Sequence, residues 1–200
     1  MAENLNYFKR WEERVRAGVF KPSRWQRKKV QLNHPDRKWI AANAETPVLD
    51  VACGTAVDSA FFTPYVGLDV TPSFIDMAKQ YGAEHLIIGD ARNIPVRDKA
   101  VTTSYTKDLL LHLPYGDAVK VIRELLRVGR RSFIAWGIGY DRGGRRVYTP
   151  VESDKDVIRR SGGFFYNRFS RKKLNRICRI GEVKHGTSIT EVKEKRRTLP

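Results

Sequence analysis

The sequence predicts an α/β fold: a doubly wound sheet of seven strands, mostly parallel, with an antiparallel hairpin at its C-terminal edge. Short apolar segments alternate with amphipathic ones between residues 47 and 138, as strands and helices do in a parallel sheet. Acidic residues stand near the ends of the first three apolar segments. Two further strand-like segments near the end of the chain would form the hairpin. A length of 200 residues suits a single domain.

The N-terminal part is expected to be helical. Leu5, Phe8, Trp11 and Val15 recur at spacings of three and four, which predicts an amphipathic helix over residues 3–17. After an interruption by two prolines, Asp36 is expected to cap a short helix that ends near Ala42.

The remaining elements follow from changes of periodicity. We expect strands at residues 48–51, 65–70, 85–88, 101–105 and 131–138, and two C-terminal strands at 182–189 and 191–197. Helices are expected at residues 58–62, 71–81, 116–128 and 170–179. The link between Asp90 and Val101 is short, which leaves little room for a helix.

The positive charge of the chain is confined to its flanks. Residues 1–46 carry a net charge of +6 and residues 139–200 a net charge of +10, whereas residues 47–138 are neutral. We therefore distinguish a basic helical segment (1–46), a ligand-binding core (47–138) and a basic part that completes the sheet (139–200). The flanks are either a solvated surface or a field that attracts an anionic partner.

Three carboxylates define the candidate site. Asp50, Asp69 and Asp90 fall at or just past the ends of the first three strands, 19 and 21 residues apart. Ligands of doubly wound sheets bind beyond the carboxyl ends of the strands, where the strand order reverses. Gly54 lies in the first turn, where a missing side chain allows close approach to the backbone.

The ligand that suits these residues carries no phosphate. A dinucleotide site needs G-x-G-x-x-G, but these positions read Ala52, Gly54 and Val57. Asp50 would also repel a pyrophosphate, whereas it would attract the ammonium and sulfonium of S-adenosylmethionine. We expect Asp69 to accept both ribose hydroxyls and Asp90 to accept the adenine amine.

The motifs resemble those of the class I S-adenosylmethionine-dependent methyltransferases, whose fold is Rossmann-like. The resemblance covers about residues 47–138 and rests on the segments 48–55, 67–70 and 89–95. Segments 107–114 and 123–128 are similar to the ubiquinone-biosynthesis-like branch. Ala56 departs from the family, which usually has glycine there, and its methyl group would crowd the cofactor.

The resemblance implies a set of cofactor-binding residues and a catalytic pair. Cofactor binding is expected of Asp50, Ala52, Cys53, Gly54, Asp69, Val70, Asp90, Ala91 and Lys107. Asp108 and His112, four residues apart, would share one face of a helical turn. His112 is expected to act as a base near neutral pH, with Asp108 orienting it or holding an amino substrate, unless His112 only packs the turn.

Three functions remain open. The first is methylation of an N or O nucleophile on RNA, or on a protein bound to RNA, with phosphates contacted by the basic flanks. The second is methylation of a small molecule, such as an amine or a phosphorylated metabolite. The third is a non-catalytic cofactor-binding module that interacts through its basic face. Signatures of DNA base methylation, Asp/Asn-Pro-Pro-aromatic and Pro-Cys, are absent from the expected positions.

Several site classes receive no support from the sequence. Two cysteines are too few for a disulfide framework, and the histidines have no partners at metal-ligand spacing. No apolar run approaches the ~20 residues of a membrane span. A cytoplasmic protein without a membrane partner or a metal is the resulting expectation.

Overall fold

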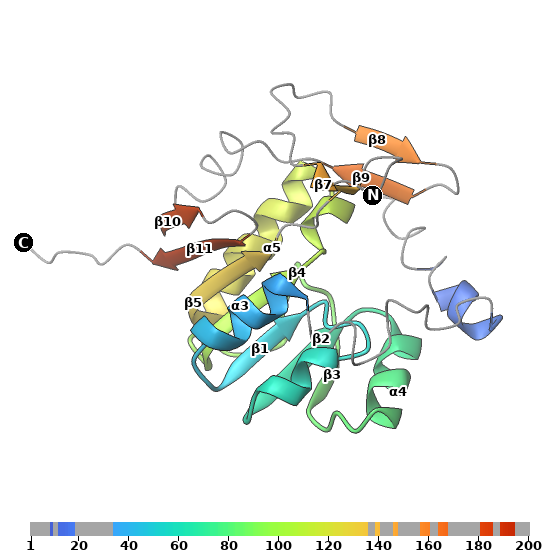
Figure 1. The fold of residues 1–200 in the computed structure, drawn as a ribbon, viewed down its shortest axis with the longest axis horizontal. Helices are drawn as coiled ribbons and strands as arrows, with labels where there is room; N and C mark the ends of the chain where they lie inside the picture. Colours follow the sequence, from blue (N-terminus) through green and yellow to red (C-terminus); the bar gives the residue numbers. More distant parts are fainter. Residues whose placement is uncertain are drawn as a thin grey trace, which may run out of the picture.

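The central part of the chain surrounds one twisted sheet (Figure 1). The computed structural model describes residue 9, residues 12–18 and 34–135, and the strands at 139–140, 146–147, 157–160, 164–167, 181–185 and 189–194. Residues 12–16 are helical, which agrees with the end of the expected first helix. The expected helix at 170–179 lies outside the described residues.

The sheet is mostly parallel with an antiparallel edge pair, as expected from the sequence. Its seven strands run in the order β10 (Gly181–His185), β11 (Ile189–Glu194), β5 (Gly129–Ala135), β4 (Val101–Lys107), β1 (Val48–Val51), β2 (Tyr65–Asp69) and β3 (Leu86–Ile88). Strands β1 to β5 are parallel, whereas β11 pairs antiparallel with β5 and β10 antiparallel with β11. The strand order reverses between β1 and β4, which defines the switch point where such sheets bind ligands.

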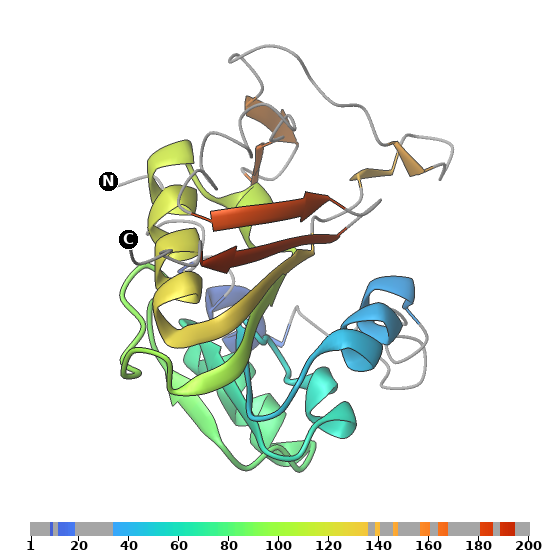
Figure 2. The same ribbon diagram turned by 90° about the vertical axis from the view of Figure 1, so that its left-hand side faces the viewer.

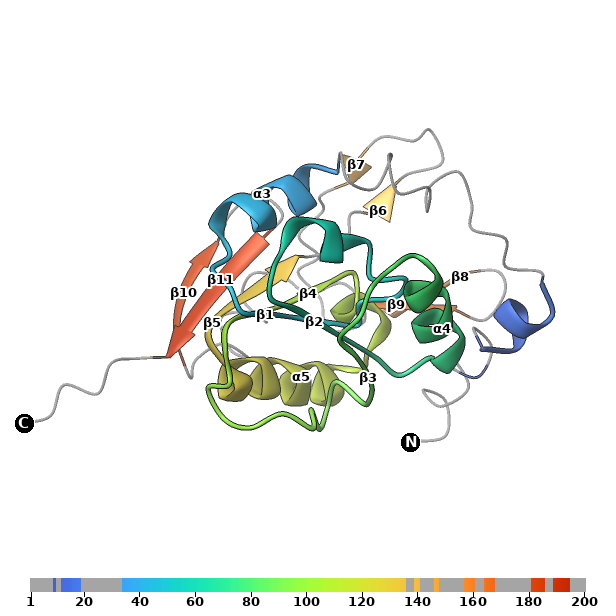
Figure 3. The ribbon, with the colours of Figure 1, turned by 90° about the horizontal axis from the view of Figure 1, so that it is seen from below.

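Helices cover both faces of the sheet. They are α3 (Pro35–Asn43), η2 (Val57–Phe61), α4 (Pro72–Gln80), η3 (Leu110–His112) and α5 (Tyr115–Val128). Helix α5 packs on one face, and α3 and η2 lie on the other (Figures 2 and 3). Strand alternation divides the core accordingly: Leu49 and Val51 join the α5 side, whereas Val48 joins the side of Ile40 on α3.

Boundaries differ from the prediction where local capping decides them. Helix α3 begins at Pro35, and its N-cap is His34 rather than Asp36, because His34 Nδ1 accepts from the Asp36 amide at 3.3 Å. Proline is well suited to this first helical position. Ile189 begins β11 instead of ending the preceding strand, and it is buried against the core.

Two short hairpins had not been expected. Strand β6 (Gly139–Tyr140) pairs with β7 (Arg146–Val147), and β8 (Val157–Arg160) pairs with β9 (Phe164–Asn167). Strand β9 lies against η3, so a segment far along the chain covers the end of β4. Among the described residues, no helix combines the length and the apolar character that crossing a membrane requires.

Gly129 is predicted to be indispensable at the start of β5. An added Cβ would lie 2.6 Å from Ser104 Oγ and 2.8 Å from the Arg131 carbonyl oxygen. The Ser104 hydroxyl is itself bonded to the Leu125 carbonyl and to Ser132. We expect Gly129→Ala to lower the free energy of unfolding by about 1–3 kcal/mol.

The matched control is Gly116→Ala in the first turn of α5, where an added Cβ meets nothing within 4 Å. There, alanine should raise the free energy of unfolding by up to about 1 kcal/mol. Urea unfolding of both variants checks the pair. Equal stability of Gly129→Ala and the wild type would contradict the close packing at this strand.

Candidate functional site

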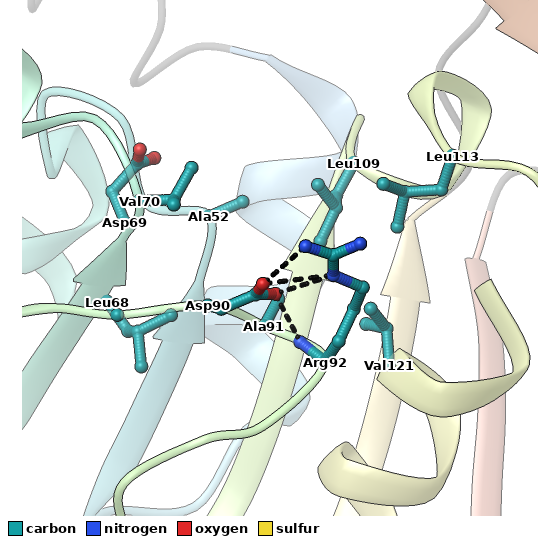
Figure 4. A pocket seen from close by; sticks show the side chains of 11 residues that line it. Ala52, Leu68, Asp69, Val70, Asp90, Ala91, Arg92, Leu109, Leu113 and Val121 are labelled. Atoms are coloured by element: carbon teal, nitrogen blue, oxygen red, sulfur yellow. Dashed lines mark hydrogen bonds and ion pairs between the residues drawn. The ribbon is translucent and has the colours of Figure 1, made fainter. Parts of the chain in front are cut away.

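A pocket opens at the switch point of the sheet, beyond the carboxyl ends of β1, β2 and β3 (Figure 4). It spans about 410 Å³ of space, open solvent included. Its walls come from three strand ends, from the turn after β4 and from α5. The lining residues are Ala52, Leu68, Asp69, Val70, Gly89, Asp90, Ala91, Arg92, Leu109, Leu113 and Val121.

The turn after β1 forms the floor of this pocket beside Asp69. Ala52, Gly54 and Ala56 have positive φ values of 64°, 55° and 50°. Glycine adopts this backbone without strain, whereas each alanine carries a cost of about 1 kcal/mol. Ala52 lines the pocket, but Ala56 is buried in the core on the α3 side. Ala56 is thus not among the lining residues, and the expectation that it crowds the cofactor stays a prediction.

Asp69 is fixed by two backbone amides. Its Oδ2 accepts from the Gly54 amide and its Oδ1 from the Thr71 amide, both at 2.9 Å. Burial raises the pKa of Asp69 above its ordinary value, and these hydrogen bonds oppose the shift. The Thr71 hydroxyl and the Val70 amide also help to hold this pKa down. Asp69 is thus held in place as an acceptor in the wall of the pocket.

Asp50 lies in the core and is not among the lining residues. Its Oδ2 accepts from the Tyr65 hydroxyl at 2.9 Å. On the same side, the Tyr105 hydroxyl donates to Asp58, which is ion-paired with Arg37. Since β1 places Asp50 on the α3 side of the sheet, its role toward the cofactor stays a prediction, and a structural role is now visible. Asp50 belongs to a buried polar network beneath the pocket.

The buried Asp50 carboxyl predicts a pH-dependent stability. Burial, opposed by the charge of Arg37, raises its pKa from 3.8 to about 6. When a carboxyl has a higher pKa in the folded than in the unfolded state, the free energy of unfolding of the protein falls as the pH rises, here from 3.8 through about 6. We expect the unfolding free energy of Asp50→Asn, relative to wild type, to rise by about 2–3 kcal/mol between pH 4 and pH 7.

Chemical denaturation at several pH values checks this expectation, and Asp76→Asn on the exposed side of α4 serves as the matched loss of one carboxylate. A difference between Asp50→Asn and wild type that does not change with pH would contradict the burial argument.

Asp90 is paired inside the pocket. Arg92 donates to both of its oxygens through the backbone amide and the guanidinium, at distances of 2.5–3.0 Å. Burial would raise the pKa of Asp90, but the Arg92 contacts hold it below its ordinary value. Figure 4 shows the guanidinium between Asp90 and Leu109. The carboxylate predicted to accept the adenine amine is thus already engaged.

The remaining predicted cofactor residues divide into two groups. Val70 and Ala91 line the pocket. The amide of Gly54 donates a hydrogen bond to Asp69, which is a lining residue. Cys53 and Lys107 are not among the lining residues. Cys53 packs on the α3 side of the core, where its sulfur would lie 2.9 Å from a Cβ at Gly67. Lys107, at the end of β4, is ion-paired with Asp108.

Asp108 and His112 do not share one face of an α-helical turn, as the sequence had suggested. Asp108 has a left-handed backbone with φ of 59°, so no helix includes it. A short 3-10 helix, η3, begins two residues later and ends at His112. His112 is half-buried and directly precedes Leu113, which lines the pocket. The assignment of this pair as catalytic stays a prediction, with the geometry of a turn instead of a helix.

The N-terminal segment is hydrogen-bonded to the first turn of α4, the helix that follows β2. Glu12 Oε2 accepts from the Ser73 amide at 3.1 Å, and Glu12 Oε1 accepts from the Ser73 hydroxyl at 2.7 Å. Thr71 is the N-cap of α4 but makes no side-chain capping bond. Glu12 therefore supplies the missing acceptor in the first turn of α4, at Ser73, four residues after Asp69.

Several lining residues escaped the sequence analysis. Leu109, Leu113 and Val121 form an apolar wall whose spacing is also that of ordinary core residues. Arg92 stood inside a motif, but nothing in the sequence tells which way its side chain points. His34 was considered only as a metal ligand. It is half-buried at the start of α3, and burial together with the nearby charge of Lys107 lowers its pKa.

Residues 49–132 match a family model described as a methyltransferase domain. This span contains the turn after β1, the three strand ends, η3 and α5. The match supports a methyltransferase domain with S-adenosylmethionine as its cofactor. No curated protein matches the chain.

Solved structures share the fold at low sequence identity. A Pyrococcus horikoshii OT3 protein superimposes with a TM-score of 0.60 at 18% identity, covering 85% of this chain and 92% of the other. Magnesium protoporphyrin IX methyltransferase of Synechocystis, with bound S-adenosylmethionine, has a TM-score of 0.56 at 15% identity, covering 84% and 81%. For 1,6-didemethyltoxoflavin-N1-methyltransferase of Burkholderia thailandensis, with bound S-adenosylhomocysteine, the values are 0.66, 12%, 94% and 87%.

Proposed function

Proceeding from a methyltransferase domain on this sheet, we propose that the protein transfers the methyl group of S-adenosylmethionine to an N or O nucleophile of RNA or another anionic acceptor. One observation carries the proposal: Asp69, a carboxylate fixed by the Gly54 and Thr71 amides, lines the pocket at the end of β2. A ribose diol is the complementary donor pair. The short segment 107–114 further supports the ubiquinone-biosynthesis-like branch of the superfamily.

The turn after β1 supports this cofactor over a dinucleotide. A dinucleotide fold holds its pyrophosphate with glycines in this turn and with the amides at the N-terminus of the helix that follows. Here the turn carries Ala52 and Ala56, and the short 3-10 helix η2 follows it. A cofactor bearing a sulfonium and an ammonium group does not need such amides, and it tolerates the neighbouring carboxylates.

The transfer step needs few chemical groups from the protein. Methyl transfer is an in-line displacement at carbon, so the enzyme aligns the acceptor, excludes water and, for some nucleophiles, removes a proton. We assign proton removal to His112, which ends η3 beside the pocket residue Leu113. Asp108, ion-paired with Lys107 at the end of β4, would orient the acceptor. Strand β9 lies against η3 and would cover this region from outside.

The charge distribution supports an anionic acceptor. The neutral core contributes nothing to the net charge of +16, which comes from residues 1–46 and 139–200. Residue Glu12 of the first segment is bonded to Ser73 in the first turn of α4, and β9 of the last segment lies beside η3. Each basic part thus has a described contact with the neutral core. RNA gains affinity from such surfaces through release of counterions.

A small-molecule acceptor is the second candidate. It is favoured by the apolar wall of Leu109, Leu113 and Val121, and the Burkholderia and Synechocystis neighbours are named for small-molecule substrates. A non-catalytic binding module is less well supported, because Asp108 and His112 would then have no function. A cytoplasmic location stays a prediction.

Transfer of a labelled methyl group tests the proposal. The protein is incubated with labelled S-adenosylmethionine and a cell extract, which is then separated into RNA, protein and small-molecule fractions. We expect the label in RNA, together with RNA binding whose affinity falls steeply as salt rises. Label in small molecules without salt-dependent RNA binding would replace the first candidate by the second. No label in any fraction would contradict enzymatic function.

A further inference from the structure

The carboxylate of Asp90 is engaged through both of its oxygens by Arg92. Its Oδ1 accepts from the Arg92 amide at 2.8 Å and from Arg92 Nε at 3.0 Å. Its Oδ2 accepts from Arg92 Nε at 3.0 Å and from Arg92 Nη2 at 2.5 Å. The Nε–H hydrogen is shared between the two oxygens, so three hydrogens of Arg92 face this carboxylate. An adenine amine would have to compete with these donors.

Arg92 also has a second carboxylate within reach. Its Nη1 donates to Asp117 Oδ2 at 2.9 Å, and Asp117 belongs to the first turn of α5. The Asp117 carboxyl, whose burial is opposed by bonds from Lys120 and Arg92, keeps a pKa below its ordinary value. The guanidinium therefore bridges a carboxylate inside the pocket and one outside its lining. Rotation toward Asp117 would free Asp90 without leaving the arginine unpaired.

We propose that Arg92 competes with the adenine amine of the cofactor for Asp90, and that cofactor binding shifts the guanidinium onto Asp117. This inference rests on the proposed function, because it requires an adenosine-bearing ligand. Arg92 is then a gate of the adenine end of the pocket: it satisfies Asp90 when the site is empty and leaves when the amine arrives. The side chain of Arg92 is already part of the lining and lies across the pocket in Figure 4.

The size of the effect follows from the exposure of the pair. The side chains of Arg92 and Asp90 are 30% and 39% exposed, so solvent screens their attraction. Pairs of this kind contribute modestly, which corresponds to a change in affinity of about two- to five-fold. Arg92→Met keeps the length of the side chain but removes every side-chain donor. It should bind S-adenosylhomocysteine about two- to five-fold more tightly than wild type.

Calorimetric titration with S-adenosylhomocysteine measures this change. Arg97→Met is the matched control, because it removes the same charge five residues along the chain at an exposed position outside the lining. Its affinity should equal that of wild type. A tighter complex in both variants would assign the effect to general electrostatics and overturn the gate.

Asp117→Asn provides the opposite perturbation. With the second carboxylate neutralised, the guanidinium remains on Asp90, and the ligand should bind about two- to five-fold more weakly. In an Arg92→Met background the same Asp117 substitution should have no effect, since no guanidinium is left to be shared. An equal loss in both backgrounds would mean that Asp117 acts without Arg92, which would overturn the proposal.

Replacing the adenine amine tests which group of the ligand donates a hydrogen bond to Asp90. S-inosylhomocysteine carries an oxygen in place of the amine and cannot donate there. The gain from Arg92→Met should therefore be confined to the adenosine compound. Binding of S-adenosylhomocysteine with unchanged or reduced affinity in Arg92→Met overturns the gate but leaves the proposed function intact. Absence of binding in wild type and in every variant overturns both.

Discussion

Asp69→Ala is expected to abolish measurable binding of S-adenosylmethionine. In the proposed complex Asp69 accepts both ribose hydroxyls, and each hydrogen bond to a charged group contributes about 1.5–3 kcal/mol. Loss of two such bonds lowers the affinity by about 100-fold or more. Calorimetry with S-adenosylmethionine or S-adenosylhomocysteine measures the loss directly. Unchanged affinity would show that the ribose assignment is wrong.

Two further variants separate this effect from damage to the fold. The alanine also deprives the Gly54 and Thr71 amides of their acceptor. Asp69→Asn keeps the shape and one class of acceptor, and we expect it to bind with an intermediate affinity. Asp76→Ala removes a carboxylate from the exposed side of α4 and should bind like wild type. Thermal unfolding of all three variants establishes that the sheet is intact.

His112→Ala is expected to reduce turnover by about 100- to 10,000-fold, the usual contribution of a general base. The affinity for S-adenosylhomocysteine should change little, because the pocket wall is formed by the neighbours Leu109 and Leu113 and not by the imidazole. Single-turnover methyl transfer to the acceptor fraction, combined with calorimetry, measures both quantities. The separation of turnover from cofactor affinity is the informative result.

His85→Ala is the matched histidine for this experiment. His85 is exposed in the segment before β3 and outside the pocket lining, so its loss should leave turnover unchanged. If His112→Ala turns over at the rate of wild type, His112 packs the η3 turn and the base must be sought elsewhere. His34, half-buried near Lys107 and Asp108, would then be the next residue to replace.

The strands and the position of the pocket could be predicted because they depend on local pattern. Apolar segments separated by amphipathic ones specify parallel strands, and the carboxyl ends of parallel strands must meet at one edge. Asp69, Asp90 and Ala91, which the sequence predicts as cofactor residues, do line the pocket. Asp50 does not line it, because side chains alternate along a strand and a shift of one residue moves a side chain to the other face of the sheet.

The contacts within the site could not be predicted, because they depend on rotamers and on distant segments. Nothing near Ser73 in the sequence indicates that Glu12 bonds to it. Similarly, Asp90 and Arg92 stand two residues apart in one motif, but the motif does not reveal that their side chains face each other. Asp108 was expected on a helix, and its left-handed backbone follows from the turn that ends β4.

The bond between Glu12 and Ser73 makes the first helix and the cofactor cavity thermodynamically interdependent. Release of that helix would deprive the Ser73 amide and hydroxyl, in the first turn of α4, of their carboxylate acceptor, four residues along the chain from Asp69. Binding of a macromolecule to the basic N-terminal segment would therefore change the affinity of the cavity for its nucleoside ligand. By thermodynamic linkage, binding of the nucleoside ligand would change the affinity of the N-terminal segment for that macromolecule by the same free energy.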